Sequence, residues 1–320
     1  MSFMQEIDVL VSEVGPRDGL QSIKRTMPTD YKVRWIAALA RAGVREIEVG
    51  SFVPARLLPQ MADAAEVVRD SAAIAGLNVL ALAPNLKGVE AAAAAGAHAV
   101  TLPISASRAH SQANIRKTPE EAMQEVGRIC AWRASLPAGR RFAVEANVAT
   151  AFGCTLEGPI SEDWVVSMAV QLAQMGADAV GLSDTTGYAN PAQVKRLFLR
   201  LRRELGDQVG GAHLHNTRGL GLANALAALE AGVTTLDSSQ GGIGGCPYAP
   251  GATGNIVTED LVFMLEAMGL RTGIDIQRLI DARQIIVEAL PGEPLYGHVP
   301  DAGLTKGFRP ASGARQAYER

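Results

Sequence analysis

The chain has 320 residues, of which 48% are hydrophobic and only 5% aromatic, so it can build a large, mostly aliphatic core. Its 30 basic and 33 acidic residues give a net charge of −3, which excludes the strongly basic balance of a nucleic-acid or anionic-membrane binder. No run approaches the roughly 18 apolar residues of a membrane-spanning helix. The length fits either two domains or one large α/β barrel.

The cysteines and the N-terminal residues point to a cytoplasmic protein. The chain has an odd number of cysteines and no CxxC spacing, which argues against a disulfide framework; the three are Cys130, Cys154 and Cys246. The first residues include Glu6 and Asp8 and lack the apolar segment of a secretory signal. We therefore expect a cytoplasmic protein with no membrane and no nucleic-acid partner.

Short β-rich runs alternate with helical patterns along the chain. The segments ARAGVREIEV, AAAGAHAVTL, AQMGADAVGL and LEAGVTTLDS each read as a helix end, a glycine and a strand; the glycines are Gly43, Gly96, Gly176 and Gly232. With the further runs 8–14, 78–83, 142–148 and 209–215, the pattern predicts eight strands. They centre near Val11, Val49, Leu80, Val100, Val144, Val180, Leu214 and Leu236. Eight strand–helix units predict an α/β fold of the (β/α)8 TIM-barrel type.

A doubly wound sheet is the alternative fold, but its usual glycine-rich first turn is missing, because that turn reads VGPRDGLQ and has no GxGxxG. We predict that residues 1–290 form the barrel, with an extra C-terminal helix over residues 274–290. The Pro/Gly-rich residues 291–320 are expected to form a surface arm rather than a second domain, with His298 structural or exposed.

Polar side chains gather at the predicted carboxyl ends of the strands, where TIM barrels carry their sites. The group comprises Arg17, Asp18, Glu48, Ser51, Ser105, Ser107, Glu145, Asn147, Ser183, Asp184, Thr185, His213, His215, Asn216, Asp237, Ser238, Ser239 and Gln240. Charged groups inside an aliphatic barrel are costly unless they are paired or bind an ion. So many of them at one end indicate a polar cavity.

His213 and His215 lie two residues apart in a predicted strand, so their side chains share one face and can point at one ion. Asp18 ends the first strand, close to them in a closed barrel, and would add a carboxylate. Nitrogen and oxygen ligands together suit Mg²⁺, Mn²⁺, Zn²⁺ or Co²⁺. The alternative is a hydrogen-bonded histidine pair in the core, since HxH spacing alone is weakly specific. The strand-end position and Asp18 favour metal binding.

The run GGIGGCPYAPGATGN, residues 241–255, is too rich in glycine to be a strand, and it carries Cys246 near its centre. The run is either a plain flexible connection or a lid that brings the thiol over the site and excludes water. A phosphate-cradling loop is a third possibility, although the Lys and Ser/Thr of a P-loop are missing.

Several motifs resemble those of 3-hydroxy-3-methylglutaryl-CoA (HMG-CoA) lyases, from about residue 8 to residue 290. They are VGPRDGLQ, PQMAD, APNLKGVEAAAAAGA, HLHNTRG and GGIGGCPYAPGATGNIVTEDLVFMLEAMGL, and the GGCPYAPGATGN loop is the most specific. That family belongs to a group of metal-dependent barrel enzymes that make or break carbon–carbon bonds next to a carbonyl. The resemblance implies the same barrel, usually as a homodimer, acting on an acyl-CoA.

The resemblance also implies roles for individual residues. A divalent metal, Mg²⁺ or Mn²⁺ with Zn²⁺ or Co²⁺ as alternatives, would be held by Asp18, His213, His215 and Asn255. In the catalytic set, which includes Asp18 and His213, Arg17 would stabilise an enolate and Cys246 would shuttle a proton. Glu48 and Gln21 would orient Arg17 and the substrate, and Asp184 would lie near the metal and the reacting hydroxyl. Asn114, Arg116 and Lys117 are candidates for binding CoA by location and charge alone.

Three stretches depart from the family pattern. Asn216-Thr217-Arg218-Gly219 stands where the family has Asp and then Thr-Tyr-Gly, Arg108 replaces a Glu, and GCTLEG replaces GCPYEG at residues 153–158. Arg218 is either a solvated residue at a helix start or a clamp for a substrate carboxylate.

The leading hypothesis is therefore cleavage of HMG-CoA to acetoacetate and acetyl-CoA. The same chemistry on another 3-hydroxyacyl-CoA, such as citramalyl-CoA, is the close alternative. A Claisen-type synthase and a non-catalytic binding protein are less favoured, because the metal positions and the Cys-bearing loop are intact.

Overall fold

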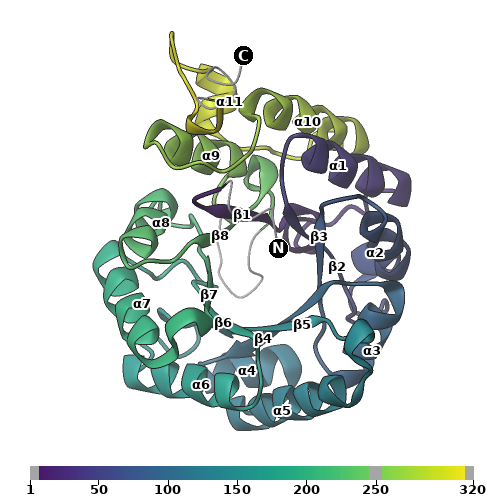
Figure 1. The fold of residues 1–320 in the computed structure, drawn as a ribbon, viewed down its shortest axis with the longest axis vertical. Coiled ribbons are helices and arrows are strands. Elements are labelled where there is room, and N and C mark those ends of the chain that lie inside the picture. Colours follow the sequence, from purple (N-terminus) through teal and green to yellow (C-terminus); the bar gives the residue numbers. More distant parts are fainter. Residues whose placement is uncertain (1–6, 245–253, 314–320) are drawn as a thin grey trace.

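The computed structural model describes residues 7–244 and 254–313, and its centre is a closed barrel of eight parallel strands in chain order (Figure 1). The strands are β1 (Leu10–Glu13), β2 (Glu46–Ser51), β3 (Asn78–Leu82), β4 (Ala99–Ser105), β5 (Ala143–Ala149), β6 (Ala179–Ser183), β7 (Val209–His213) and β8 (Thr235–Ser238). β8 pairs with β1 and closes the ring. The predicted (β/α)8 TIM barrel is confirmed.

The helices form a ring around the barrel (Figure 1). Those that follow strands β1 to β8 are α1 (Thr29–Arg41), α2 (Ala64–Ala72), α3 (Leu86–Ala95), α5 (Pro119–Ser135), α6 (Glu162–Gln174), α7 (Pro191–Leu205), α8 (Gly221–Glu230) and α9 (Thr258–Ala267). A short helix, α4 (Arg108–Ile115), is inserted between β4 and α5. The predicted extra C-terminal helix is α10 (Ile276–Ala289), which lies beside α1.

Local sequence explains where the helices begin and end. Asn85 caps the start of α3 by accepting a hydrogen bond from the Gly88 N–H, and α5 starts with a reciprocal capping box between Thr118 and Glu121. The glycines read from the repeated pattern end their helices with positive φ; Gly96, for example, has a φ of 99°. These stops turn the chain back into the next strand, which sets the strand–helix alternation of the barrel.

The chain after α10 packs on α9 rather than on a separate core. Asp260 on α9 accepts hydrogen bonds from the N–H groups of His298 and Val299, at the start of α11 (His298–Ala302). The rings of Phe263 and Phe308 lie 5.0 Å apart. Among the described residues, no helix is long and apolar enough to cross a membrane.

Candidate active site

A cavity of about 1240 Å³ opens at the carboxyl ends of the strands and extends into the barrel. Barrel interiors are usually filled by branched aliphatic side chains. Here the lining includes aliphatic residues such as Leu80 and Leu82, but it also includes the polar side chains of Ser12, Glu46, Thr101, Glu145, Asn147 and Asp237, and glycines of β6 and β7. A Cβ on Gly181 would lie 2.2 Å from Oδ1 of Asn147, so any larger residue at this position would push the Asn147 side chain aside. The predicted polar cavity is confirmed.

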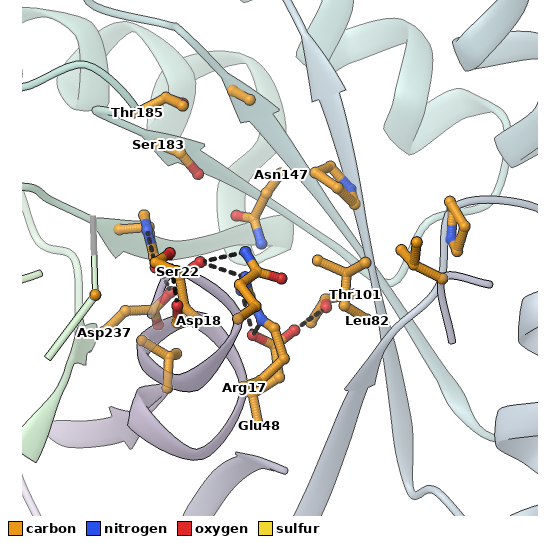
Figure 2. Close-up of a pocket in the computed structure, with 18 of the residues that line it drawn as sticks. Arg17, Asp18, Ser22, Glu48, Leu82, Thr101, Asn147, Ser183, Thr185 and Asp237 are labelled. Carbon is orange, nitrogen blue, oxygen red and sulfur yellow. Dashed lines mark hydrogen bonds and ion pairs between the residues drawn. The ribbon is translucent and has the colours of Figure 1, made fainter. Parts of the chain in front are cut away.

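Arg17 and Asp18 lie in a short π-helical turn, η2 (Gly15–Gly19), directly after β1, and both are buried. The guanidinium of Arg17 lies between two carboxylates (Figure 2): Nη1 donates to Oδ1 of Asp18 at 2.5 Å, and Nε donates to Oε2 of Glu48. The hydroxyl of Thr101 donates to the other oxygen of Glu48. Charge-assisted hydrogen bonds on two sides hold the guanidinium in one orientation at the cavity wall.

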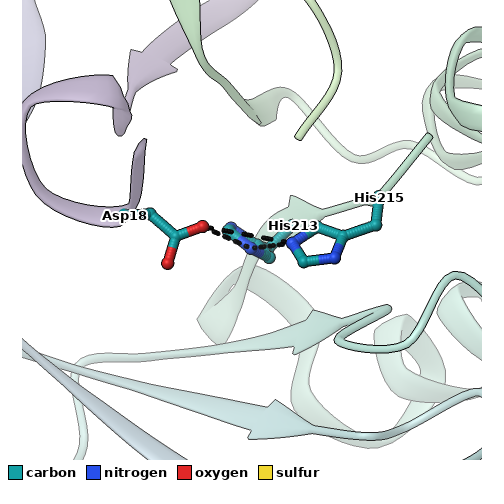
Figure 3. A group of neighbouring side chains, drawn as sticks. All are labelled: Asp18, His213 and His215. Atoms are coloured by element: carbon teal, nitrogen blue, oxygen red, sulfur yellow. Dashed lines mark hydrogen bonds and ion pairs between the residues drawn. The ribbon is translucent and has the colours of Figure 1, made fainter. Parts of the chain in front are cut away.

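His213, His215 and Asp18 converge at one point of the cavity (Figure 3). The two Nε2 atoms lie 3.3 Å apart, and Oδ2 of Asp18 lies 3.9 Å from Nε2 of His213 and 4.0 Å from Nε2 of His215. The histidines therefore meet as their spacing in the sequence predicts. β7 ends at His213, however, and His215 pairs instead with Asn255 in an isolated antiparallel bridge.

The geometry of this cluster fits a divalent metal. A triangle with sides of 3.3, 3.9 and 4.0 Å has a centre about 2.2 Å from each corner, close to metal–nitrogen and metal–oxygen bond lengths. Asn255 is buried beside it: Nδ2 donates to Oδ2 of Asp18 at 2.6 Å, and Oδ1 has no hydrogen-bond partner among the described residues. An unpartnered amide oxygen is a suitable additional ligand for a hard cation.

Burial and charge set the protonation of the cluster. Burial alone would raise the pKa of Asp18, but the neighbouring Arg17 and the two histidines lower it to about 2. Burial, together with the adjacent His213, lowers the pKa of His215 to about 4. Asp18 is therefore an anion and His215 neutral near pH 7, which are the forms that bind metal.

Asp237 on β8 orients His213. It faces His213 in the register of β7 and β8, and its Oδ2 lies 2.9 Å from Nδ1 of His213. Burial would lower the pKa of His213, but the hydrogen bond to Asp237 and its charge raise it. A carboxylate on Nδ1 directs Nε2 towards the cavity, as in many carboxylate–histidine–metal arrangements.

The two described ends of the glycine-rich segment 241–255, for which the sequence leaves a flexible connection, a lid or a phosphate-cradling loop open, lie against the cluster. Gly244 has a φ of 105°, and a Cβ there would lie 2.7 Å from Cα of Gly19; a Cβ on Gly254 would lie 1.6 Å from the carbonyl oxygen of Gly244. The two ends are therefore pressed together and against the turn that carries Asp18. Cys246, predicted to shuttle a proton, lies outside the described residues.

Gln21 lines the cavity beside this cluster, whereas Asp184 is not among the lining residues and reaches the cluster through its N–H, which donates to the carbonyl of His213. Nε2 of Gln21 donates to Oδ1 of Asp18 at 2.9 Å. Asp184 is buried directly after β6, where its Oδ1 accepts hydrogen bonds from the N–H groups of Tyr188 and Ala189. Its Oδ2 has no partner among the described residues, and burial raises its pKa to about 6.

The candidates for CoA binding divide into two groups. Asn114, Arg116 and Lys117 all line the mouth of the cavity. Arg218 is not among the lining residues: Nη1 donates to the carbonyl oxygens of Thr186 and Gly187, and its guanidinium lies 4.7 Å from the centre of the Tyr188 ring. In this position Arg218 ties the loop after β6 to the loop after β7.

Arg108, which stands where the family has a Glu, is exposed and pairs with Glu120 at 2.6 Å. Several lining residues were not singled out from the sequence: His110, Arg56, Glu293, Pro294 and Tyr296. The last three belong to the segment predicted as a surface arm. In this segment, the N–H of Tyr296 donates a hydrogen bond of 2.7 Å to the carbonyl oxygen of Gly241. Only the helical spacing of His110 and Asn114 could have drawn attention to His110.

A closed parallel barrel with a polar cavity and an Asp–His–His cluster at its strand ends defines a TIM-barrel protein with a candidate divalent-metal site. Residues 8–286 match the HMGL-like family model, and the chain belongs to that family. The resemblance found in the sequence is thereby confirmed.

Individual relatives agree with this assignment. The mitochondrial hydroxymethylglutaryl-CoA lyase of Gallus gallus is 40% identical over 90% of this chain and 95% of its own length. The cytoplasmic 3-hydroxy-3-methylglutaryl-CoA lyase of Rattus norvegicus is 39% identical over 88% of this chain and 81% of its own. A solved HMG-CoA lyase from Acinetobacter baumannii, in complex with coenzyme A and 3-methylmalate, is 39% identical with a TM-score of 0.88, covering 97% and 99% of the two chains.

Proposed function

We propose that this protein is a lyase that cleaves HMG-CoA to acetoacetate and acetyl-CoA. The observation that carries the proposal is the position of Arg17 beside the Asp18–His213–His215 cluster, in a member of a family whose relatives are HMG-CoA lyases. Cleavage next to a thioester needs a group that activates the 3-hydroxyl and a cation that stabilises the enolate left on the thioester. The cluster, with a metal bound, and Arg17 would supply these two functions side by side.

Asp18, His213, His215 and Asn255 would hold the metal, which when bound supplies a Lewis acid for substrate oxygens. Arg17, fixed by Glu48, would stabilise the negative charge that develops on the thioester oxygen. Asp184, whose N–H donates to the carbonyl of His213, would lie near the metal and the reacting hydroxyl. Gln21 would orient Asp18 and the substrate, and Cys246 would return a proton to the acetyl-CoA carbon.

The proposed activity is tested by measuring acetoacetate formation from HMG-CoA with the purified full chain. After treatment with a chelator the activity should fall to background, and adding Mg²⁺ or Mn²⁺ should restore it. Citramalyl-CoA, assayed in parallel, should be cleaved far more slowly. No acetoacetate from HMG-CoA under any of these metal conditions would exclude the proposal, and faster cleavage of citramalyl-CoA would reassign the substrate.

We also propose Mg²⁺ or Mn²⁺ as the native metal, a homodimer as the assembly and the cytoplasm as the location. The oxygen-rich neighbourhood of Asp18 and Asn255 supports a hard cation. The two cysteines within the described residues, Cys130 and Cys154, are free and buried, in keeping with a reducing compartment. Metal analysis of the protein as purified and light scattering in solution test the first two proposals directly.

A further inference from the structure

The segment that follows α10 forms part of the cavity mouth. Glu293, Pro294 and Tyr296 line the same cavity as Arg17 and Asp18. Neither the metal cluster nor the cation beside it accounts for these three residues. They come from a stretch whose composition predicts a surface arm, so specific contacts must hold the stretch at the cavity.

A closed ring of four hydrogen bonds holds this segment in place. The N–H of Tyr296 donates to the carbonyl oxygen of Gly241 at 2.7 Å, and the N–H of Gly241 donates to Oε2 of Glu259 at 3.0 Å. Nη1 of Arg283 donates to Oε1 of Glu259 at 2.8 Å and to the carbonyl oxygen of Tyr296 at 2.9 Å. The ring therefore joins α9, α10, the segment after α10 and the first residue of the glycine-rich segment 241–255.

The charged members of this ring are buried. The side chain of Glu259 is 0% exposed and that of Arg283 is 14% exposed. A buried carboxylate that loses its only cationic partner is strongly destabilising, so the ion pair is costly to break. Because one Nη1 atom serves both Glu259 and the carbonyl of Tyr296, the atom that neutralises the carboxylate also fixes the segment at the mouth.

Two glycines provide the surface on which the segment packs. Gly241 has a φ of 66°, and a Cβ on it would lie 2.9 Å from Cδ2 of Leu295. Gly242 has a φ of 61°, and a Cβ on it would lie 3.4 Å from Cβ of Tyr296. The side chains of Leu295 and Tyr296 therefore lie against bare backbone. Tyr296 is nevertheless 48% exposed, so part of its side chain is open to a ligand in the cavity mouth.

The charge of the mouth depends on which segment lines it. Arg56, Arg116 and Lys117 make the loop after β2 and the stretch after α4 basic. The segment after α10 instead contributes the carboxylate of Glu293 and two uncharged rings. An anionic phosphate is repelled by a carboxylate, so this segment suits an uncharged part of a ligand. A tyrosine ring offers such a part a large, rigid surface.

We propose that the ring of Tyr296 binds an uncharged part of the acyl-CoA by apolar contact, and that Arg283 is the positioning residue that holds this ring at the cavity mouth. The inference rests on the proposed function, because that function places an acyl-CoA in the cavity. The N–H and the carbonyl of Tyr296 are occupied by the hydrogen-bond ring, which leaves its side chain for the ligand. Arg283 does not line the cavity and acts through Glu259 and the main chain of Tyr296.

Calorimetry with coenzyme A on the metal-loaded full chain tests the contact. Tyr296→Ala removes the ring but keeps both main-chain hydrogen bonds, so the Kd of coenzyme A should rise roughly tenfold. Tyr296→Phe keeps the apolar ring and should bind coenzyme A as wild type does. Leu199→Ala, at a 43% exposed residue of α7 outside the cavity lining, is the control for loss of a large exposed side chain and should leave the Kd unchanged.

Stability and kinetics separate a ligand contact from a structural role. In urea, the metal-free Tyr296→Ala protein should unfold at nearly the same concentration as wild type, because the residue is half exposed. In turnover of HMG-CoA, KM should rise roughly tenfold and kcat should stay within about twofold, since such a contact is made equally in the ground and transition states. A purely structural ring would instead lower the stability and leave Kd and KM in place.

Arg283 is tested together with its buried partner. Combining Arg283→Met with Glu259→Gln removes both charges and keeps an acceptor for the N–H of Gly241, so no carboxylate is left unpaired. The Kd of coenzyme A should rise severalfold, because the carbonyl of Tyr296 has lost its donor. Adding Tyr296→Ala should give the Kd of Tyr296→Ala alone, since the arginine acts through that ring. Arg278→Gln, exposed on the same helix, is the control.

A second variant covers poor folding of this combination. Arg283→Lys keeps the charge beside Glu259 but lacks the planar fork, so it should also raise the Kd of coenzyme A and should lose this effect in a Tyr296→Ala background. An unchanged Kd in the folded variants of Arg283 would exclude its positioning role.

The outcomes also distinguish the inference from the proposed function. Coenzyme A binding without cleavage of HMG-CoA would exclude the function, while the affinities of the Tyr296 variants would still decide the contact. Normal cleavage with an unchanged Kd and KM in Tyr296→Ala would overturn the inference alone. An equal loss in Tyr296→Phe would overturn it as well, because the hydroxyl rather than the ring would then bind the ligand. Failure of the wild-type protein to bind coenzyme A would overturn both.

Discussion

Asn255 donates a hydrogen bond of 2.6 Å to Oδ2 of Asp18, so the end of the glycine-rich segment 241–255 contacts the Asp18–His213–His215 cluster directly. The same stretch pairs with the chain that carries the histidines, because Asn255 bridges to His215 and the N–H of Asn216 donates to the carbonyl of Gly254. A change in this segment can therefore reach Asp18 through one side chain and reach His215 through the backbone.

Replacing Asn255 with Ala should weaken metal binding, because it removes both an oxygen near the cluster and the donor that orients Asp18. We expect the Kd for Mn²⁺ to rise by roughly tenfold, comparable to the loss of a charge-assisted hydrogen bond. Titration of the metal-free protein with Mn²⁺ measures this. An unchanged Kd would show that Asn255 is neither a ligand nor a support for one.

Asp237→Asn should reduce metal affinity although it removes none of the proposed metal ligands. The carboxylate fixes the ring of His213 through Nδ1, and loss of such an outer partner typically costs roughly 10- to 100-fold in affinity. Asp281→Asn, at an exposed position on α10, is the control and should bind metal normally. Equal affinities in the two variants would contradict an orienting role for Asp237.

Arg17→Lys should lower kcat by roughly 100-fold or more while the metal content stays unchanged. Lysine keeps the charge but cannot bridge Asp18 and Glu48 with a planar fork, so the cation is no longer held at the point where the enolate forms. Steady-state kinetics with metal analysis measure both quantities, and Arg34→Lys on the exposed side of α1 is the control. Metal loss in Arg17→Lys would instead assign the arginine to holding Asp18.

Cys246→Ser should cut turnover strongly and leave metal content unchanged, because a serine hydroxyl is a much poorer proton donor than a thiol near pH 7. Cys130→Ala, whose thiol is buried away from the cavity, is the comparison. Survival of turnover in Cys246→Ser would exclude the proton-shuttle role.

Most of the barrel could be predicted because its signals are local. A glycine ends each of several helices, and a β-rich run follows it, as at Gly96 and β4. The histidine pair was also accessible, because two residues in a strand share a face. The end of β7 at His213 was not, since His215 is drawn out of the strand by a bridge to Asn255, 40 residues further on.

The remaining features depend on contacts between distant segments. Asp237 was visible as a polar strand end, but its bond to His213 follows from the register of β7 and β8, which no local pattern encodes. Likewise, the Pro/Gly-rich composition after α10 predicts an irregular segment but not the surface on which it packs. The N–H of Tyr296 joins it to Gly241, and this places the segment at the cavity mouth.

Glu13, at the end of β1, should make the stability of the protein depend on pH. It is fully buried; Oε1 accepts hydrogen bonds from the N–H groups of Gly15 and Gln240, and Oε2 lies 2.7 Å from Oγ1 of Thr258. Burial raises its pKa from 4.5 to about 8. The protonated carboxyl is therefore favoured in the folded state, and its contribution is complete below pH 4.5 and is lost as the pH rises through 8.

Glu13→Gln should remove this dependence, because glutamine offers an oxygen to the two N–H groups and an amide to Thr258 without a titrating proton. Urea unfolding of the metal-free protein at about pH 5, 6.5 and 8 gives the free energy of unfolding for each form. Relative to wild type, the variant should gain stability by a few kcal/mol between about pH 5 and pH 8. In the control Glu204→Gln, at an exposed position on α7, the free energy of unfolding should depend on pH as it does in wild type. Parallel curves for Glu13→Gln as well would mean that the folded protein tolerates an ionised Glu13, held by its three hydrogen bonds.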